Sequence, residues 1–247
     1  MIHVVTSCSP KGWGIYGKRF VDSFLKHWPS SVQLHVFLES SDFPLGYPQV
    51  LFHDLEADRE HEEFCEKWSG PEWNDPRDFN AQSTKFCHKV FAITSPELPT
   101  SGWRIWVDAD VVSHAAPDIA SLLPATASVC YLGRDPHQWI VNAVPRPICS
   151  ETGFVAYDMD DLHVHALLAD MRRWYTTGEL FTRPKTDWHD AKCFDVCLAR
   201  SEVASNRRLS YSEKAKGTDV WPQTQLASWG HHYKGPRRKA AVYGAVT

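Results

Sequence analysis

Along the whole chain, short apolar runs of strand length alternate with segments whose apolar residues recur at helical spacing. Ile2–Thr6 and Val32–Leu38 are expected to be strands, and the helical spacing between them, from Phe20 to Trp28, ends at Pro29. A strand, a helix and a second strand in this order predict a right-handed crossover between parallel strands. The continued alternation predicts an α/β fold with a mostly parallel, mixed central sheet flanked by helices.

The later elements are expected in the same alternating order. Helices are predicted at 56–68, 79–94, 161–175 and 189–199, and strands at 103–107, 128–133 and 152–158. The segments 7–14 and 69–78 have the Gly, Pro and polar content of loops, and the tail from Asn206 is expected to be irregular. A chain of 247 residues with 43 % apolar content can bury a full core, which favours one domain over 1–247.

Composition excludes some classes of protein. A formal net charge of −4 lacks the basic excess of proteins that bind nucleic acid in bulk. The apolar runs are too short to cross a bilayer, so we expect no signal peptide and no membrane span. Seven cysteines without paired spacing favour a reducing compartment, and hence the cytoplasm.

Two carboxylates directly follow one of the predicted strands. Asp108-Ala109-Asp110 comes after the apolar run Trp103–Val107, at the strand end where open α/β sheets bind ligands. Carboxylates in this pattern suit a hard divalent cation, which supplies positive charge to a departing diphosphate. The alternative is a solvated turn that caps the following segment.

The surrounding residues resemble a known family. From Phe79 to Leu123 the chain resembles the core of GT-A glycosyltransferases: a helix with Lys85 and Lys89, an aromatic and apolar strand, Asp-x-Asp, and a Pro-Asp-Ile-x-x-Leu turn. Thr152-Gly153-Phe154-Val155 resembles the Asn-Ser-Gly strand of the glycogenin and bacterial lipooligosaccharide galactosyltransferase group, with Glu151 in place of the asparagine. The resemblance implies a GT-A fold and a metal-dependent glycosyltransferase that uses a nucleoside-diphosphate sugar, with a uridine diphosphate carrier preferred.

The same resemblance assigns roles to the acidic pair and to the C-terminal segment. Asp108 would meet the ribose or the metal, and Asp110 would bind the metal and the diphosphate. The family's His-x-x-Gly-x-x-Lys segment matches His232, Gly235 and Arg238, with Lys239 following, so that His232 would complete a manganese or magnesium site. His231 is a competing ligand, and a solvated basic tail is the alternative. The resemblance implies that the nucleotide-sugar donor is contacted by Thr6, Ser7, Lys11, Lys85, Lys89, Asp108, Lys234, Gly235, Arg238 and Lys239.

The catalytic carboxylate is less well defined. The family has Asp-Gln where this chain has Asp190-Ala191, so a retaining mechanism does not transfer, and inverting and retaining chemistry both stay open. The candidate bases are Asp190, Glu151 and Asp187. His189, Cys193 and Cys197 would share a helix face, but they lack a fourth zinc ligand, and the two cysteines are interpreted as core residues.

The resemblance also divides the chain into two functional halves. Residues 1–127 would bind the nucleotide sugar, and 128–247 would bind an acceptor that the sequence does not identify: a saccharide, a lipid, a protein or a modified nucleobase. A sugar-phosphate nucleotidyltransferase is an alternative, but Ser7–Gly14 is poorer in Gly and basic residues than that class usually requires. A non-catalytic module that binds nucleotides or sugars is the other alternative.

Overall fold

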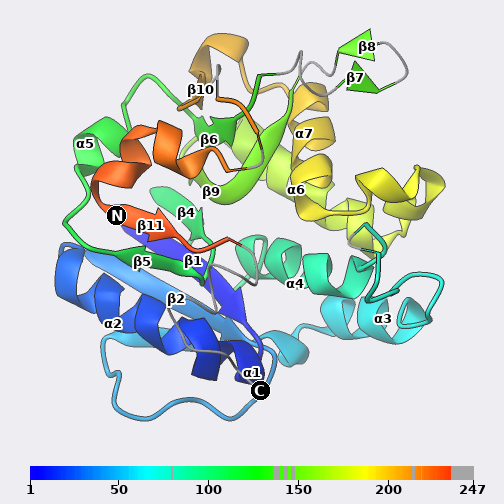
Figure 1. Cartoon of the computed structure of the whole chain (residues 1–247), viewed down its shortest axis with the longest axis horizontal. Coiled ribbons are helices and arrows are strands. Elements are labelled where there is room, and N and C mark those ends of the chain that lie inside the picture. The colour runs from blue at the N-terminus through cyan, green and yellow to red at the C-terminus, as the bar shows by residue number, and fades with distance from the viewer. Residues whose placement is uncertain are drawn as a thin grey trace.

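The computed structural model describes residues 1–78, 80–135, 140–141, 144–145, 148–212, 215–217 and 219–234 (Figure 1). Its strands are β1 (Ile2–Cys8), β2 (Val32–Leu38), β3 (Val50–Asp54), β4 (Trp103–Val107), β5 (Val111–Ser113), β6 (Val129–Gly133), β7 (Ile140–Val141), β8 (Val144–Pro145), β9 (Ser150–Asp158), β10 (Arg208–Ser210) and β11 (Gly230–His232). Its helices are α1 (Pro10–Gly12), α2 (Lys18–His27), α3 (Arg59–Lys67), α4 (Ser83–Ile93), α5 (Ile119–Leu122), α6 (Leu162–Thr176) and α7 (Asp190–Arg200). A π-helical segment, Trp13–Gly17, joins α1 to α2, and short 3-10 turns connect several later elements.

A seven-stranded sheet has the order β10-β6-β9-β4-β1-β2-β3. Strand β9 is antiparallel to both of its neighbours, whereas β3, β2, β1 and β4 run parallel, and β10 runs parallel to β6. The predicted α/β fold, with its mostly parallel mixed sheet, is therefore confirmed. Chain order reverses between β1 and β4, and the carboxyl ends of strands at such a switch point form the usual ligand crevice of open α/β sheets.

Each face of the sheet has its own apolar core. Successive strand residues point to opposite faces, so Val5 and Trp106 pack with α3, α4, α6 and α7, whereas Val4 and Ile105 pack with α2 and the C-terminal Trp-rich segment. Figure 1 shows this division, with α4, α6 and α7 together on one side and α2 and the β5–β11 ribbon on the other. The rigid sheet between these two cores carries the loops that follow β1 and β4.

Several regions differ from the sequence-based expectation. Strand β1 extends to Cys8, and Pro10–Gly17 is helical where a loop was expected, because the Ser9 side chain caps the turn by accepting from the Gly12 amide. Strands β3, β5, β7 and β8 were not expected. The tail after Asn206 is not irregular: it supplies edge strand β10 and strand β11.

Within the described residues, no helix is both long enough and apolar enough to cross a lipid bilayer.

Candidate active site

The loop after β4 holds the acidic pair in a defined conformation. The Asp108 amide donates to the Gly153 carbonyl of β9 at 3.0 Å, and the Val111 amide donates back to the Asp108 carbonyl at 3.0 Å. The Trp106 indole, two residues earlier on β4, donates to Asp108 Oδ1 at 2.7 Å. These bonds fix the Asp108 carboxylate at the carboxyl edge of the sheet.

Strand β11 brings His232 to this loop. It pairs antiparallel with β5, with His232 opposite Val111, and the Tyr233 amide continues the ladder to the Asp110 carbonyl at 3.1 Å. His232 Nε2 consequently lies 3.2 Å from Asp110 Oδ1 and 3.5 Å from Asp108 Oδ2. One ligand atom from each of the three residues lies within 4.8 Å of the others. Two carboxylates and one imidazole fit the ligand preferences of manganese or magnesium with remaining positions for phosphate oxygens.

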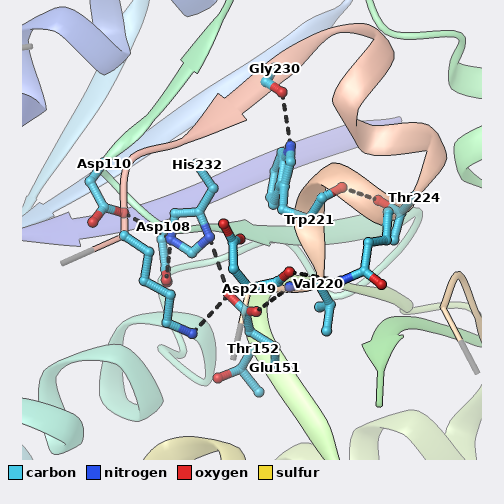
Figure 2. A network of polar contacts seen from close by, with 12 residues as sticks. Asp108, Asp110, Glu151, Thr152, Asp219, Val220, Trp221, Thr224, Gly230 and His232 are labelled. Carbon is cyan, nitrogen blue, oxygen red and sulfur yellow. Dashed lines mark hydrogen bonds and ion pairs between the residues drawn. The ribbon is translucent and has the colours of Figure 1, made fainter. Parts of the chain in front are cut away.

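Glu151 lies behind the imidazole. Its Oε1 is 3.2 Å from His232 Nδ1 and 3.1 Å from Lys234 Nζ, and Figure 2 shows His232 between the aspartates and this glutamate. A carboxylate on the far nitrogen of a ligating histidine fixes the orientation and the tautomer of the ring. Burial opposes ionisation of Glu151, but the contact with His232 and the charge of Lys234 outweigh it and lower the pKa of Glu151 to about 2.

The imidazole also requires a glycine on β9. A Cβ at Gly153 would lie 2.8 Å from His232 Cε1 and 3.1 Å from its Nδ1. Contacts below 3.0 Å do not occur between a real Cβ and its neighbours without movement. The glycine at 153 therefore lets the ring of His232 approach β9 closely.

A half-buried lysine of α4, Lys89, connects this cluster to α7. Lys89 Nζ lies 2.9 Å from Asp108 Oδ1 and 3.0 Å from Asp190 Oδ2, and it donates to the Thr152 carbonyl. The Thr152 hydroxyl in turn donates to Asp190. The cavity beside Lys89, which Trp106 also lines, measures about 10 Å³, which is about the size of a single water.

The charges of the cluster compensate one another. Burial disfavours the ionised Asp108, but the Lys89 charge and the His232 contact outweigh burial and lower the pKa of Asp108. Burial likewise disfavours a charged His232, but its hydrogen bonds to Asp108, Asp110 and Glu151 raise the pKa of His232 well above 6.5. A proton therefore occupies the imidazole that faces the aspartates, and a bound cation would have to displace it.

The other described candidate residues predicted from the sequence lie on β1, on α1, on α4 and in the turn before α7. Asp187, in a 3-10 turn before α7, pairs with Arg183 at 3.1 Å. Thr6 is buried near the end of β1, Ser7 is partly exposed, Lys11 is exposed on α1, and Lys85 contacts Gln82 and Phe86 on α4. Gly235, Arg238 and Lys239 lie outside the described residues.

The neighbour of His232 faces the other way. His231 is exposed, and its ring stacks on His114 with centroids 4.5 Å apart. Adjacent residues of a strand point to opposite faces, so of the two histidines only His232 reaches the aspartates. Cys193 and Cys197 lie on the buried face of α7 and pack into the core, as their interpretation as core residues predicted.

Sequence reasoning missed two supporting residues, Trp106 and Thr152. The indole of Trp106 could have been anticipated, because residues two apart on a strand share a face and Trp106 precedes Asp108 by two. The Thr152 contacts with Lys89 and Asp190 depend on how β9, α4 and α7 pack together, and no local pattern predicts them.

Comparisons with known proteins extend these observations. No protein-family profile matches the chain, and no curated protein matches its sequence. The solved structures that match its fold include two glycosyltransferases. The bifunctional glycosyltransferase WbbM, in its apo form, aligns with 95 % of this chain at TM-score 0.52 and 12 % identity, and this chain spans 46 % of that one, under half its length. Mouse xyloside xylosyltransferase 1, also in its apo form, aligns over 92 % of this chain and 91 % of its own length, at TM-score 0.51 and 10 % identity. The predicted glycosyltransferase fold is thus confirmed.

Proposed function

We propose that this protein is a metal-dependent glycosyltransferase that moves a sugar from a nucleoside-diphosphate sugar to an acceptor. The observation that carries the proposal is the convergence of Asp108, Asp110 and His232 at the carboxyl edge of β4. The fold shared with two glycosyltransferase structures supports it. A uridine diphosphate carrier is proposed on the sequence resemblance to the glycogenin group.

The proposed metal site consists of Asp108, Asp110 and His232, with manganese or magnesium as the cation. When bound, the cation supplies positive charge that stabilises the departing diphosphate. Glu151 orients the His232 ring, and its contacts with His232 and Lys234 make this role a better fit than that of a base. Lys234, on the exposed side of Glu151, is placed to approach the diphosphate, and Gly235, Arg238 and Lys239 remain proposed donor contacts.

Asp190 is the proposed carboxylate for the reacting sugar. Lys89 links it to Asp108, so it is held beside the metal site, at the start of α7. Lys89 and Thr152 hold the carboxylate in one orientation, which suits a group that must meet a sugar hydroxyl or an acceptor proton. Asp187 pairs with Arg183 and is a weaker candidate for this role.

Release of nucleoside diphosphate from a panel of nucleotide sugars tests the proposal. With manganese and without an acceptor, we expect slow hydrolysis of at least one donor, with a uridine diphosphate sugar preferred, and loss of the activity in excess chelator. Release of pyrophosphate from a nucleoside triphosphate and a sugar phosphate would instead indicate a nucleotidyltransferase. Tight nucleotide binding with no product from any donor would indicate a non-catalytic module and would contradict the proposal.

A further inference from the structure

Two histidines and two cysteines meet between α3 and α4, outside the proposed active site. His61 and Cys65 lie one turn apart on α3, and Cys87 and His88 are adjacent on α4. One ligand atom from each of the four lies within 4.8 Å of all the others. His61 and Cys87 are buried, and Cys65 and His88 are half-buried.

The separations of these atoms match a tetrahedral zinc site. Zinc bond lengths and a tetrahedral angle require about 3.8 Å between two sulfurs and about 3.6 Å between sulfur and nitrogen. Cys65 Sγ and Cys87 Sγ lie 3.7 Å apart, Cys65 Sγ and His61 Nε2 lie 3.5 Å apart, and Cys87 Sγ and His88 Nδ1 lie 3.9 Å apart. His61 Nε2 and His88 Nδ1, at 2.8 Å, are closer than the roughly 3.3 Å of two zinc-bound nitrogens, because they share a hydrogen bond.

A carboxylate supports the ring of His88 from behind. His88 Nε2, the nitrogen that points away from the sulfurs, lies 3.6 Å from Glu39 Oε2. Glu39 follows β2 directly, and a carboxylate on the outer nitrogen is the usual partner of a zinc-bound histidine.

We propose that His61, Cys65, Cys87 and His88 bind a structural zinc ion that joins α3 to α4. A disulfide between Cys65 and Cys87 would use the two sulfurs but would leave the convergence of the two imidazoles unexplained. The ion would hold α4 in place directly before Lys89, whose ammonium contacts Asp108 and Asp190. This zinc site has four protein ligands and no open position, so its role is structural and independent of the proposed transfer reaction.

Metal analysis of the untagged full chain, expressed with zinc in the medium, tests the proposal. We expect about one zinc ion per chain after extensive dialysis, and at least a tenfold lower zinc content in Cys65→Ser. Cys197→Ser, a matched substitution of a buried cysteine under α7, should keep the zinc. Asp110→Asn should also keep it, which separates this site from the active-site cation. Glu39→Gln should weaken zinc affinity by about 10- to 100-fold.

Cobalt substitution uses the parent protein, so its result does not depend on whether a variant folds. The visible spectrum should show the intense bands of tetrahedral cobalt with thiolate ligands. A parent chain that binds no zinc, or a spectrum without thiolate bands, would overturn the proposal. So would a Cys65–Cys87 disulfide in peptide mapping under non-reducing conditions, or unchanged zinc content in Cys65→Ser.

Discussion

Glu151 Oε1 lies 3.2 Å from His232 Nδ1, and both side chains are almost completely buried. This contact directs the other ring nitrogen of His232 at the two aspartates of the β4 loop. The glutamate is therefore the residue that sets the orientation of the proposed histidine ligand, although it never faces the cation itself.

Replacing this glutamate should weaken cation binding. The negative charge of Glu151 orients the His232 ring and makes the ring more basic, and Glu151→Gln removes this charge. Substituting a residue that orients a metal-binding histidine typically lowers metal affinity by about 10- to 100-fold. Manganese affinity measured by calorimetry at alkaline pH, where protons compete least, gives the test. Glu179→Gln, which changes a carboxylate paired with Arg173 and Arg200, is the matched control and should bind as the parent does. Equal affinities for the two variants would contradict the role of Glu151.

Manganese affinity should rise with pH. The pKa of His232 lies well above 6.5 in the metal-free protein, so at neutral pH the ring is protonated and must lose its proton to bind a cation. Affinity should therefore increase by up to about tenfold per pH unit from 6.5 upward, until pH passes the raised pKa. Calorimetry in buffers of different ionisation enthalpy should detect the released proton.

Substituting each of the two adjacent histidines should show which ring causes this pH dependence. His232→Ala should weaken manganese binding and flatten its pH profile, whereas His231→Ala, which changes the exposed ring on His114, should do neither. A loss in His231→Ala with parent behaviour in His232→Ala would contradict the register of β11.

A single methyl group on β9 should disturb the site. Gly153→Ala places a Cβ where the His232 ring now lies, 2.8 Å from Cε1, so the ring must move. A displacement of about 1 Å in a catalytic group costs on the order of a hundredfold in rate, and donor hydrolysis should fall to that extent. Gly14→Ala, where nothing lies within 4 Å of the added Cβ, should hydrolyse the donor at the parent rate. Parent-like hydrolysis by Gly153→Ala would show that the ring position does not matter.

Lys89 should be important for stability. Lys89→Met leaves the carboxylates of Asp108 and Asp190 without their shared cation. Because Lys89 and Asp108 are half-buried, the loss should lie between the roughly 0–1 kcal/mol that is typical of an exposed pair and the roughly 3–5 kcal/mol of a fully buried one. Chemical denaturation of the metal-free protein measures the free energy of unfolding. Lys85→Met, on the exposed side of the same helix, should change it by less than about 0.5 kcal/mol. A similar small change for Lys89→Met would mean that the carboxylates are neutralised in another way.

Local patterns predict the central part of the fold well. Some segments are long enough for the residue pattern to distinguish the period of a strand from that of a helix. These are the apolar runs at β1, β2, β4, β6 and β9 and the helically spaced segments at α2, α4, α6 and α7. Local patterns do not predict strands β3, β10 and β11. Strands β10 and β11 are only three residues long, and in β3 Val50 is buried while Leu51 is exposed. Such short strands are stabilised by pairing with β2, β6 and β5, which is tertiary information.

The same distinction applies to the two candidate metal sites. Asp108 and Asp110 are adjacent to a strong strand, and the family resemblance added His232 from the far end of the chain. The His61 and Cys65 spacing and the Cys87-His88 pair are visible in the sequence, but each supplies only two ligands. Their meeting depends on the packing of α3 against α4, so the four-residue cluster emerges only from the structure.

Donor hydrolysis by Asp110→Asn, compared with Asp118→Asn, tests whether the acidic pair after β4 holds the cation that the proposed reaction needs. Both substitutions remove one carboxylate charge, but Asp118 caps α5, where Asn is an equally good cap, whereas Asp110 faces His232. Asp110→Asn should lose on the order of a hundredfold in manganese-dependent release of nucleoside diphosphate, because a metal ligand and its charge are both affected, and Asp118→Asn should match the parent. Equal release by Asp110→Asn, Asp118→Asn and the parent at every manganese concentration would contradict the proposed metal site and the transfer reaction built on it.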